Sequence, residues 1–225
     1  MDVKDVLKQL EKKGDPANLE GMARYGITPE KSYGASLPDI RTVAKGIKKD
    51  HALALELWDT GIMEAQFVAV LIADPKKVDR GLMERWASDF SYWSICDHAC
   101  MNLFFKVPGA WETALEWSTR NEPYVKRAAF AIMAKMATKA AKRTDEKLEE
   151  FIPVIVAAAK DDRNEVKKGV SWALRQIGKR SWYLNEKVVK AAEELEKDPA
   201  SKWAAKDVLR ELRSDKVKER LDKRK

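Results

Sequence analysis

The sequence has little of what disulfide scaffolds, metal centres and cofactor sites are made from. It contains 2 cysteines and 2 histidines. Two cysteines do not make a disulfide framework. Cys96, His98 and Cys100 are too few ligands for a closed zinc site, and His51 is the only other histidine. We therefore predict small buried thiols and no metal. The phosphate-loop glycine pattern, the HExxH motif and the nucleophile elbow are also missing, so we expect no cofactor.

Long apolar runs are missing as well. No run of about 18 apolar residues occurs, which is the length that a membrane-spanning helix needs. Charged residues make up 35% of the chain. The N-terminal stretch MDVKDVLKQLEKKGD has no apolar signal core. We expect a soluble, cytoplasmic protein without a membrane span, and we expect it to be a monomer.

Glycine and proline are sparse, with 10 and 8 residues, and no segment alternates in the manner of a strand. Pro123 and Pro153 stand where a first helical turn tolerates proline. The residues between them are rich in Ala, Leu, Met, Lys and Glu, which favour helix. The sequence therefore predicts an all-α fold.

A loose internal repeat organises the predicted helices. Five helical segments resemble one another, and each follows another helical stretch: EAQFVAVLIA at 64–73, ICDHACMNLF at 95–104, VKRAAFAIMA at 125–134, VKKGVSWALR at 166–175 and WAAKDVLREL at 203–212. One helix pair cannot bury its apolar face alone, so neighbouring pairs stack. We predict a curved α-solenoid of about six HEAT-like helix pairs. It would form a single domain over residues 1–213, followed by a basic C-terminal tail at 214–225.

The repeat register places Asp97, Arg127 and Lys168 at equivalent positions, with Trp203 near the fourth. Equivalent positions in a solenoid line one surface, usually the concave one. We therefore predict that side chains from successive second helices face a common groove.

The segment 164–180 carries two stripes at helical spacing. The apolar stripe, which we expect in the core, is Val166, Val170, Ala173 and Ile177. The basic stripe on the opposite face is Lys168, Trp172, Arg175 and Lys179. Two interpretations remain open. The basic stripe binds phosphates with Trp172 offered to a sugar or base, or Trp172 covers a neighbouring repeat while the cations are solvated.

Arg127 and Asp97 each have two interpretations. Arg127 lies off the apolar stripe of Val125, Ala129, Ile132 and Met136. An arginine there suits bidentate contact with phosphate, or it is a surface side chain or a partner of Asp97. Trp93 and Asp97 share a helix face, one turn apart. Asp97 is either a cap or an ion-pair partner, or it is directed at a cation.

The charge balance is basic. Lys and Arg outnumber Asp and Glu by 43 to 36, which gives a formal net charge of +7. A nucleic acid is one partner that fits this charge, although many proteins with neutral partners are equally basic.

These segments together resemble the AlkD-type DNA alkylation repair family, the HEAT-like alkylpurine DNA glycosylases. WSICD resembles the family's Trp-x-x-x-Asp, and VKKGVSWALRQIGK resembles its Lys-x-x-x-Trp-x-x-Arg helix. VKRAAFAIMAK resembles its Arg-centred helix, with Lys135 eight residues after Arg127. MARYGITPEKSYGASLPDIRTVAKGI resembles its N-terminal segment, with Tyr25 in the matching place. The charged connection at 138–147 is longer than the family pattern.

The resemblance implies hydrolysis of the N-glycosidic bond of cationic N3- or N7-alkylated purines in duplex DNA, without base flipping. It assigns Trp93, Asp97 and Trp172 to the sugar of the lesion, and Arg127 to its backbone. It places further DNA contacts at Tyr25, Lys135, Lys168, Arg175 and Lys179.

The chemistry of the reaction agrees with those roles. Breaking the bond leaves an oxocarbenium-like sugar, which a carboxylate and indole faces stabilise. Two other functions stay open: a non-catalytic HEAT-like binder of damaged or branched DNA, and a protein-interaction scaffold.

Overall fold

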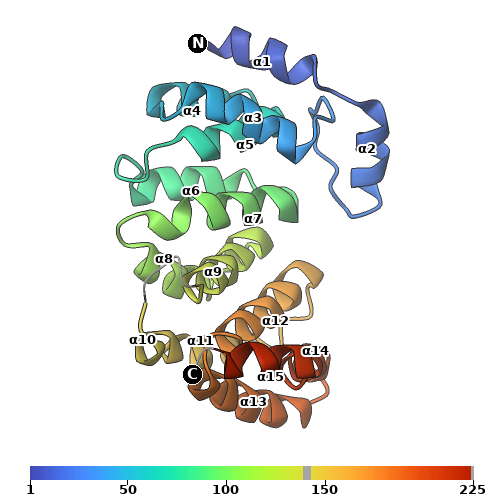
Figure 1. Ribbon diagram of the computed structural model, residues 1–225, viewed down its shortest axis with the longest axis vertical. Helices are drawn as coiled ribbons and strands as arrows, with labels where there is room; N and C mark the ends of the chain where they lie inside the picture. The colour runs from blue at the N-terminus through green and yellow to red at the C-terminus, as the bar shows by residue number, and fades with distance from the viewer. Residues whose placement is uncertain (139–142, 224–225) are drawn as a thin grey trace. The chain divides into compact units, whose positions relative to one another are not determined.

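The computed structural model describes residues 1–138 and 143–223, and their regular secondary structure is helical (Figure 1). Within these ranges the extended backbone pairs at one isolated bridge, between Lys31 and Ile62. The all-α prediction is confirmed. Of the charged connection at 138–147, residues 139–142 lie outside the described residues.

The chain divides into two compact units, Met1–Pro108 and Gly109–Lys225. The helices of the first unit are α1 (Val3–Glu11), α2 (Pro16–Ala23), α3 (Leu37–Ile47), α4 (His51–Asp59), α5 (Met63–Ile72), α6 (Arg80–Ser88), α7 (Trp93–Asn102) and the 3-10 helix η1 (Phe104–Lys106). Those of the second unit are α8 (Ala110–Trp117), α9 (Pro123–Met136), α10 (Asp145–Glu149), α11 (Phe151–Ala157), α12 (Asn164–Gly178), α13 (Trp182–Glu196), α14 (Lys202–Leu212) and α15 (Asp215–Asp222).

Local sequence signals explain where many of these helices begin. The Asp2 carboxylate accepts from the Asp5 amide at 2.9 Å, and the Asp5 side chain reaches back to the Asp2 amide, which makes a capping box on α1. The Ser181 hydroxyl accepts from the backbone amide at the start of α13. Pro123 and Pro153 lie in the first turns of α9 and α11, as predicted.

The repeated segments of the sequence are the second helices of helix pairs, α5, α7, α9, α12 and α14. In the first unit α4 packs on α5, and α5 packs on α7. In the second unit α8 packs on α9, and α9, α12 and α14 pack on one another in that order. Side chains on successive second helices therefore come together within each unit. The extent of a single repeat domain over 1–213 stays a prediction.

The two predicted apolar stripes are buried, as expected. Val125, Ala129, Ile132 and Met136 of α9 are each at most 5% exposed, and Val166, Val170, Ala173 and Ile177 of α12 are at 0%. The helical period therefore identifies the packed faces of both helices correctly. Stacked aromatic pairs complete the cores. The ring centroids of Trp58 and Trp86 lie 4.0 Å apart, and those of Trp111 and Phe151 lie 3.7 Å apart.

The predicted basic tail includes a helix. Residues 215–222 form α15, which packs against α14 and buries Val217 and Leu221. Within residues 1–138 and 143–223, no helix has both the length and the apolar character needed to cross a membrane.

Candidate functional site

Helix α7 presents Trp93 and Asp97 away from its packed face. Ile95, Cys96 and Ala99 are at most 1% exposed and fill the core of the first unit. Trp93, four residues before Asp97, keeps 37% of its surface exposed, and Asp97 is half-buried. The helical spacing thus places an exposed indole and a half-buried aspartate one turn apart on one helix.

The Trp93 ring is held in place by a backbone group from the segment after α2. Its Nε1 donates to the Tyr25 carbonyl at 2.9 Å. The Tyr25 side chain is itself 74% exposed. Two aromatic residues predicted to contact DNA, 68 positions apart in the chain, therefore lie together.

A buried carboxylate fixes the connection that follows Tyr25. Glu64 on α5 is 0% exposed. Its oxygens accept from the backbone amides of Gly34 and Ala35 at 2.8 and 3.1 Å, and from the Ser32 hydroxyl at 2.7 Å. Gly34 has a φ of 78°, and a Cβ there would stand 2.2 Å from the Asp15 carbonyl oxygen. The connection between α2 and α3 is therefore held in place by the bonds to Glu64 and by the close approach of Gly34 to Asp15.

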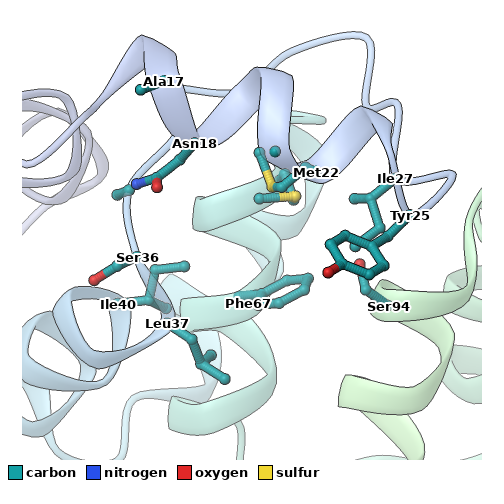
Figure 2. Close-up of a pocket in the computed structure, with 13 residues that line it drawn as sticks. Ala17, Asn18, Met22, Tyr25, Ile27, Ser36, Leu37, Ile40, Phe67 and Ser94 are labelled. Carbon is teal, nitrogen blue, oxygen red and sulfur yellow. The ribbon is translucent and has the colours of Figure 1, made fainter.

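An apolar pocket of about 380 Å³ lies between α2, α3 and α5, beside the start of α7. Figure 2 shows Met22 and Phe67 at its centre, with Tyr25 and Ser94 at one end. The Ser94 hydroxyl is buried and has no hydrogen-bond partner among the described residues. The pocket suits an uncharged group. The charge that the predicted reaction needs lies outside it, on Asp97.

In the second unit the Arg127 side chain is buried rather than exposed to solvent. It is 7% exposed, and its Nη1 donates to the Glu165 carbonyl, at the start of α12, at 2.9 Å. Arg127 passes Gly169 of α12, where a Cβ would stand in ordinary van der Waals contact, 3.5 Å from the Arg127 Cγ. Arg127 therefore joins α9 to the helix that carries the predicted basic stripe.

The basic stripe of α12 divides into two halves. Lys168 is exposed and Trp172 is half-buried. With its amide oxygen turned toward the indole, Gln176 accepts from Trp172 Nε1 at 3.1 Å. This half offers a cation and an aromatic ring.

The other half of the stripe is paired with acidic residues of α14. Arg175 Nε lies 3.3 Å from an Asp207 oxygen, and Glu211 accepts from both Arg175 and Lys179. Burial raises the pKa of Glu211, but the bonds from Lys179 and Arg175 outweigh it and leave the pKa lowered. The Ser171 hydroxyl also bonds Asp207, at 2.6 Å. Arg175 and Lys179 therefore have their charges compensated.

The remaining candidates occupy ordinary environments. Lys135 is half-buried in the last turn of α9, where a cation is favoured by the helix dipole. Cys96 and Cys100 are buried thiols, as predicted. His98 stacks on Phe67 with ring centroids 4.2 Å apart. Burial lowers the pKa of His98 to about 4. Within the described ranges, no group of three or more His, Cys, Asp or Glu side chains is arranged to hold a metal ion.

Comparison with known protein families bears on this arrangement. The sequence model of a family described as "DNA alkylation repair enzyme" matches residues 6–212. The chain belongs to the DNA alkylation repair enzyme family. No curated protein sequence matches this member of the family.

Solved structures give the fold of this DNA alkylation repair enzyme family member. One is described as belonging to "a new family of proteins related to the HEAT-like repeat DNA glycosylases with affinity for branched DNA structures". It is 21% identical, with a TM-score of 0.77, and the match covers 93% of this chain and 95% of the other. At this identity it shows the HEAT-like fold. A designed armadillo repeat protein in complex with a (KR)4 peptide is 13% identical with a TM-score of 0.41, over 96% of this chain and 87% of the other, and is too remote to inform function.

The structure brings the predicted residues together in two sets. Trp93 and Asp97 share α7, and Tyr25 joins them through its carbonyl. Arg127 lies against α12, which carries Lys168 and Trp172. A common concavity for Asp97, Arg127 and Trp172 stays a prediction.

Three acidic residues with structural roles were missed by sequence reasoning. These are Glu64, Asp207 and Glu211. The sequence held a signal for the last two, because Ser171 and Asp207, and Arg175 and Glu211, are each 36 positions apart, close to one repeat.

Proposed function

We propose that this chain is a DNA glycosylase that hydrolyses the N-glycosidic bond of cationic N3- or N7-alkylated purines in duplex DNA without flipping the base. The observation that carries the proposal is the exposed Trp93 indole and the half-buried Asp97, one turn apart on α7, in a chain of the DNA alkylation repair enzyme family. A DNA partner also fits the net charge of +7.

The proposed chemistry needs a negative charge at the sugar. An alkylated purine leaves as a neutral base, so no general acid is required. Positive charge develops on the sugar as the bond breaks, and the Asp97 carboxylate stabilises it and orients the attacking water. The π faces of Trp93 and Trp172 add cation–π attraction of about 0.5 to 2 kcal/mol each.

The same carboxylate opposes binding of undamaged DNA. A negative charge beside phosphates raises the free energy of the complex before reaction. That penalty is recovered only when the sugar becomes cationic, so Asp97 acts on the transition state rather than on the ground state.

Asp97→Asn tests the proposal. The rate of excision of 7-methylguanine under single-turnover conditions is expected to fall by about 10- to 1000-fold, because one preorganised electrostatic contact is lost. DNA affinity and the melting temperature should stay the same, or affinity should rise. Trp172→Ala is expected to lower both affinity and rate, since its ring meets the sugar before and during reaction.

Asp59→Asn, which removes an exposed carboxylate from α4, is the matched control. It should excise at the wild-type rate. A lower melting temperature with an unchanged rate for Asp97→Asn would instead make Asp97 a cap or ion-pair partner.

A second candidate is binding of branched DNA without excision. It is favoured by the branched-DNA affinity that the description of the structural neighbour gives for that neighbour's family. Release of free 3-methyladenine or 7-methylguanine from methylated duplex DNA separates the two. Binding to a four-way junction with no released base would support the second.

A further inference from the structure

An exposed tryptophan to which the family resemblance assigns no role lies at the start of α14, near the fourth position of the repeat register. Trp203 is 47% exposed, more than the indole of Trp93 at 37%. The core positions of α14 are filled by other residues, Ala204, Ala205 and Val208, each at most 2% exposed. The fold therefore does not require a large apolar side chain at Trp203.

A lysine from the neighbouring helix lies over this ring. Lys167 Nζ is 5.3 Å from the centroid of Trp203. The two helices are locked together one turn further on, where Ser171 bonds Asp207 at 2.6 Å. The indole is thus held beside a cation by a fixed helix pair, while nearly half of its surface remains open to solvent.

Exposed residues close to Trp203 and Lys167 in the sequence are basic. Lys202 and Lys206 flank Trp203 on the surface of α14, and Lys168 follows Lys167 on α12; all three are exposed. The nearest acid along α14, Asp207, is bonded by Ser171 and Arg175. We call Trp203, Lys167, Lys168, Lys202 and Lys206 the Trp203 patch.

We infer that the Trp203 patch binds single-stranded nucleic acid, with Trp203 stacked on an unpaired base and the lysines on adjacent phosphates. An indole face stacks on any base and is sequence-tolerant. Bases inside a duplex show only their edges in the grooves, so a face-on contact needs an unpaired base at a strand end, flap or branch. An acidic peptide would use the lysines but would not require the ring.

The inference rests on the DNA-binding part of the proposed function, and it is independent of excision. It extends the proposed DNA contacts of the second unit from Lys168 and Trp172 on α12 to Trp203 on α14, in the next helix pair. Single-stranded DNA would then leave the duplex beside α14.

Binding of two DNA molecules tests it. Dissociation constants are measured by fluorescence anisotropy for a blunt duplex and for the same duplex with a single-stranded extension. The wild type should bind the extended DNA more tightly, by about 5- to 100-fold from one stacked base. Trp203→Ala should abolish that gain and leave the blunt-duplex affinity unchanged, whereas Trp203→Phe should keep most of it.

Tyr183→Ala is the matched control. Tyr183 is also an exposed aromatic residue, at 43%, with Lys187 Nζ 5.3 Å from its ring centroid, but it lies on α13, the first helix of the pair. This variant should keep the full gain.

Three results would overturn the inference: an unchanged gain in Trp203→Ala, an equal loss of affinity for both DNA molecules, or no DNA binding by the wild type. Poly-L-glutamate that binds the wild type as tightly as the extended DNA does would also overturn it, and would assign the lysines to an acidic protein instead. Excision of 7-methylguanine is measured in parallel. If no base is released, the proposed glycosylase activity is rejected, while the anisotropy measurements still test the Trp203 patch independently.

Discussion

Glu64 is a charged side chain that the fold can bury because backbone amides surround it. Its carboxylate accepts from the amides of Tyr33, Gly34 and Ala35 and from the Ser32 hydroxyl. Hydrogen bonds to a charged group are stronger than neutral ones, and their loss would leave buried amides unsatisfied. Glu64 is therefore a main support of the connection that carries Tyr25 toward Trp93.

Glu64→Ala is therefore expected to lower the free energy of unfolding by at least about 2 kcal/mol, since two or more buried amides lose their acceptor. Urea denaturation at neutral pH measures it. Glu56→Ala, on the exposed face of α4, should change stability by less than about 0.5 kcal/mol. Equal effects of the two substitutions would contradict the role of Glu64.

His98 links stability to pH. Burial lowers its pKa in the folded state from 6.5 to about 4, and Arg41 adds to the lowering, while the bond to the Phe67 carbonyl opposes it. Between these values the unfolded chain binds a proton that the folded chain does not. Stability is therefore complete above pH 6.5 and decreases as the pH falls toward 4.

His98→Gln should reduce that pH dependence. The decrease in unfolding free energy between pH 7.5 and 4.5 is expected to be smaller than in the wild type by about 2 to 3 kcal/mol. Urea titrations of both proteins at the two pH values give the difference. If the unfolding free energies of the two proteins depend on pH in the same way, folding does not lower the pKa of His98.

At the scale of elements, the α12–α14 contact both stabilises the second unit and masks two cations. Glu211 accepts from Arg175 and Lys179 across this contact. Removing its charge leaves more of the positive charge of Lys179 and Arg175 uncompensated, although Arg175 keeps its ion pair with Asp207. Uncompensated positive charge near the proposed DNA-binding surface would increase the attraction for phosphate.

Glu211→Gln is expected to raise duplex affinity several-fold at low salt, to steepen its salt dependence and to lower the melting temperature. Glu193→Gln changes the net charge equally and breaks the Arg213 pair between α13 and α14. It should change duplex affinity little. If both variants gain affinity equally, net charge rather than the position of the cations is responsible.

The sequence predicts the packed faces of these helices well, because helical periodicity depends only on local spacing. It did not predict the burial of Arg127, because that depends on how α9 packs against α12 and on the Glu165 carbonyl, a partner on another helix. Nor did it predict that Arg175 is paired, because its partners Asp207 and Glu211 come from the next repeat. Glu64 was missed for a related reason, since its partners are mainly backbone amides that leave no mark in the residue pattern.

For the molecule as a whole, the excess of positive charge predicts duplex binding that is weak, independent of sequence and sensitive to salt. Lys168 is the exposed cation of the predicted stripe. Lys168→Ala should lower affinity for all duplex sequences alike and reduce the slope of log K against log salt by about 1.

Anisotropy titrations over a range of salt concentrations measure this slope. Lys197→Ala removes a charge that pairs with Glu194 near the end of α13 and should leave the slope unchanged. Affinity that stays constant from low to high salt would reject the electrostatic account for the whole molecule.

The hydrogen bond from Trp93 to the Tyr25 carbonyl has a consequence for selectivity. An indole has one donor and no acceptor, so with this donor engaged the side chain has no hydrogen-bonding edge to offer a purine. Its π face is indifferent to whether adenine or guanine lies above it. In the proposed reaction, discrimination at this tryptophan would therefore come from kinetics. A damaged purine would be distinguished by the weakness of its own glycosidic bond, and a normal purine would be left intact because its bond breaks slowly.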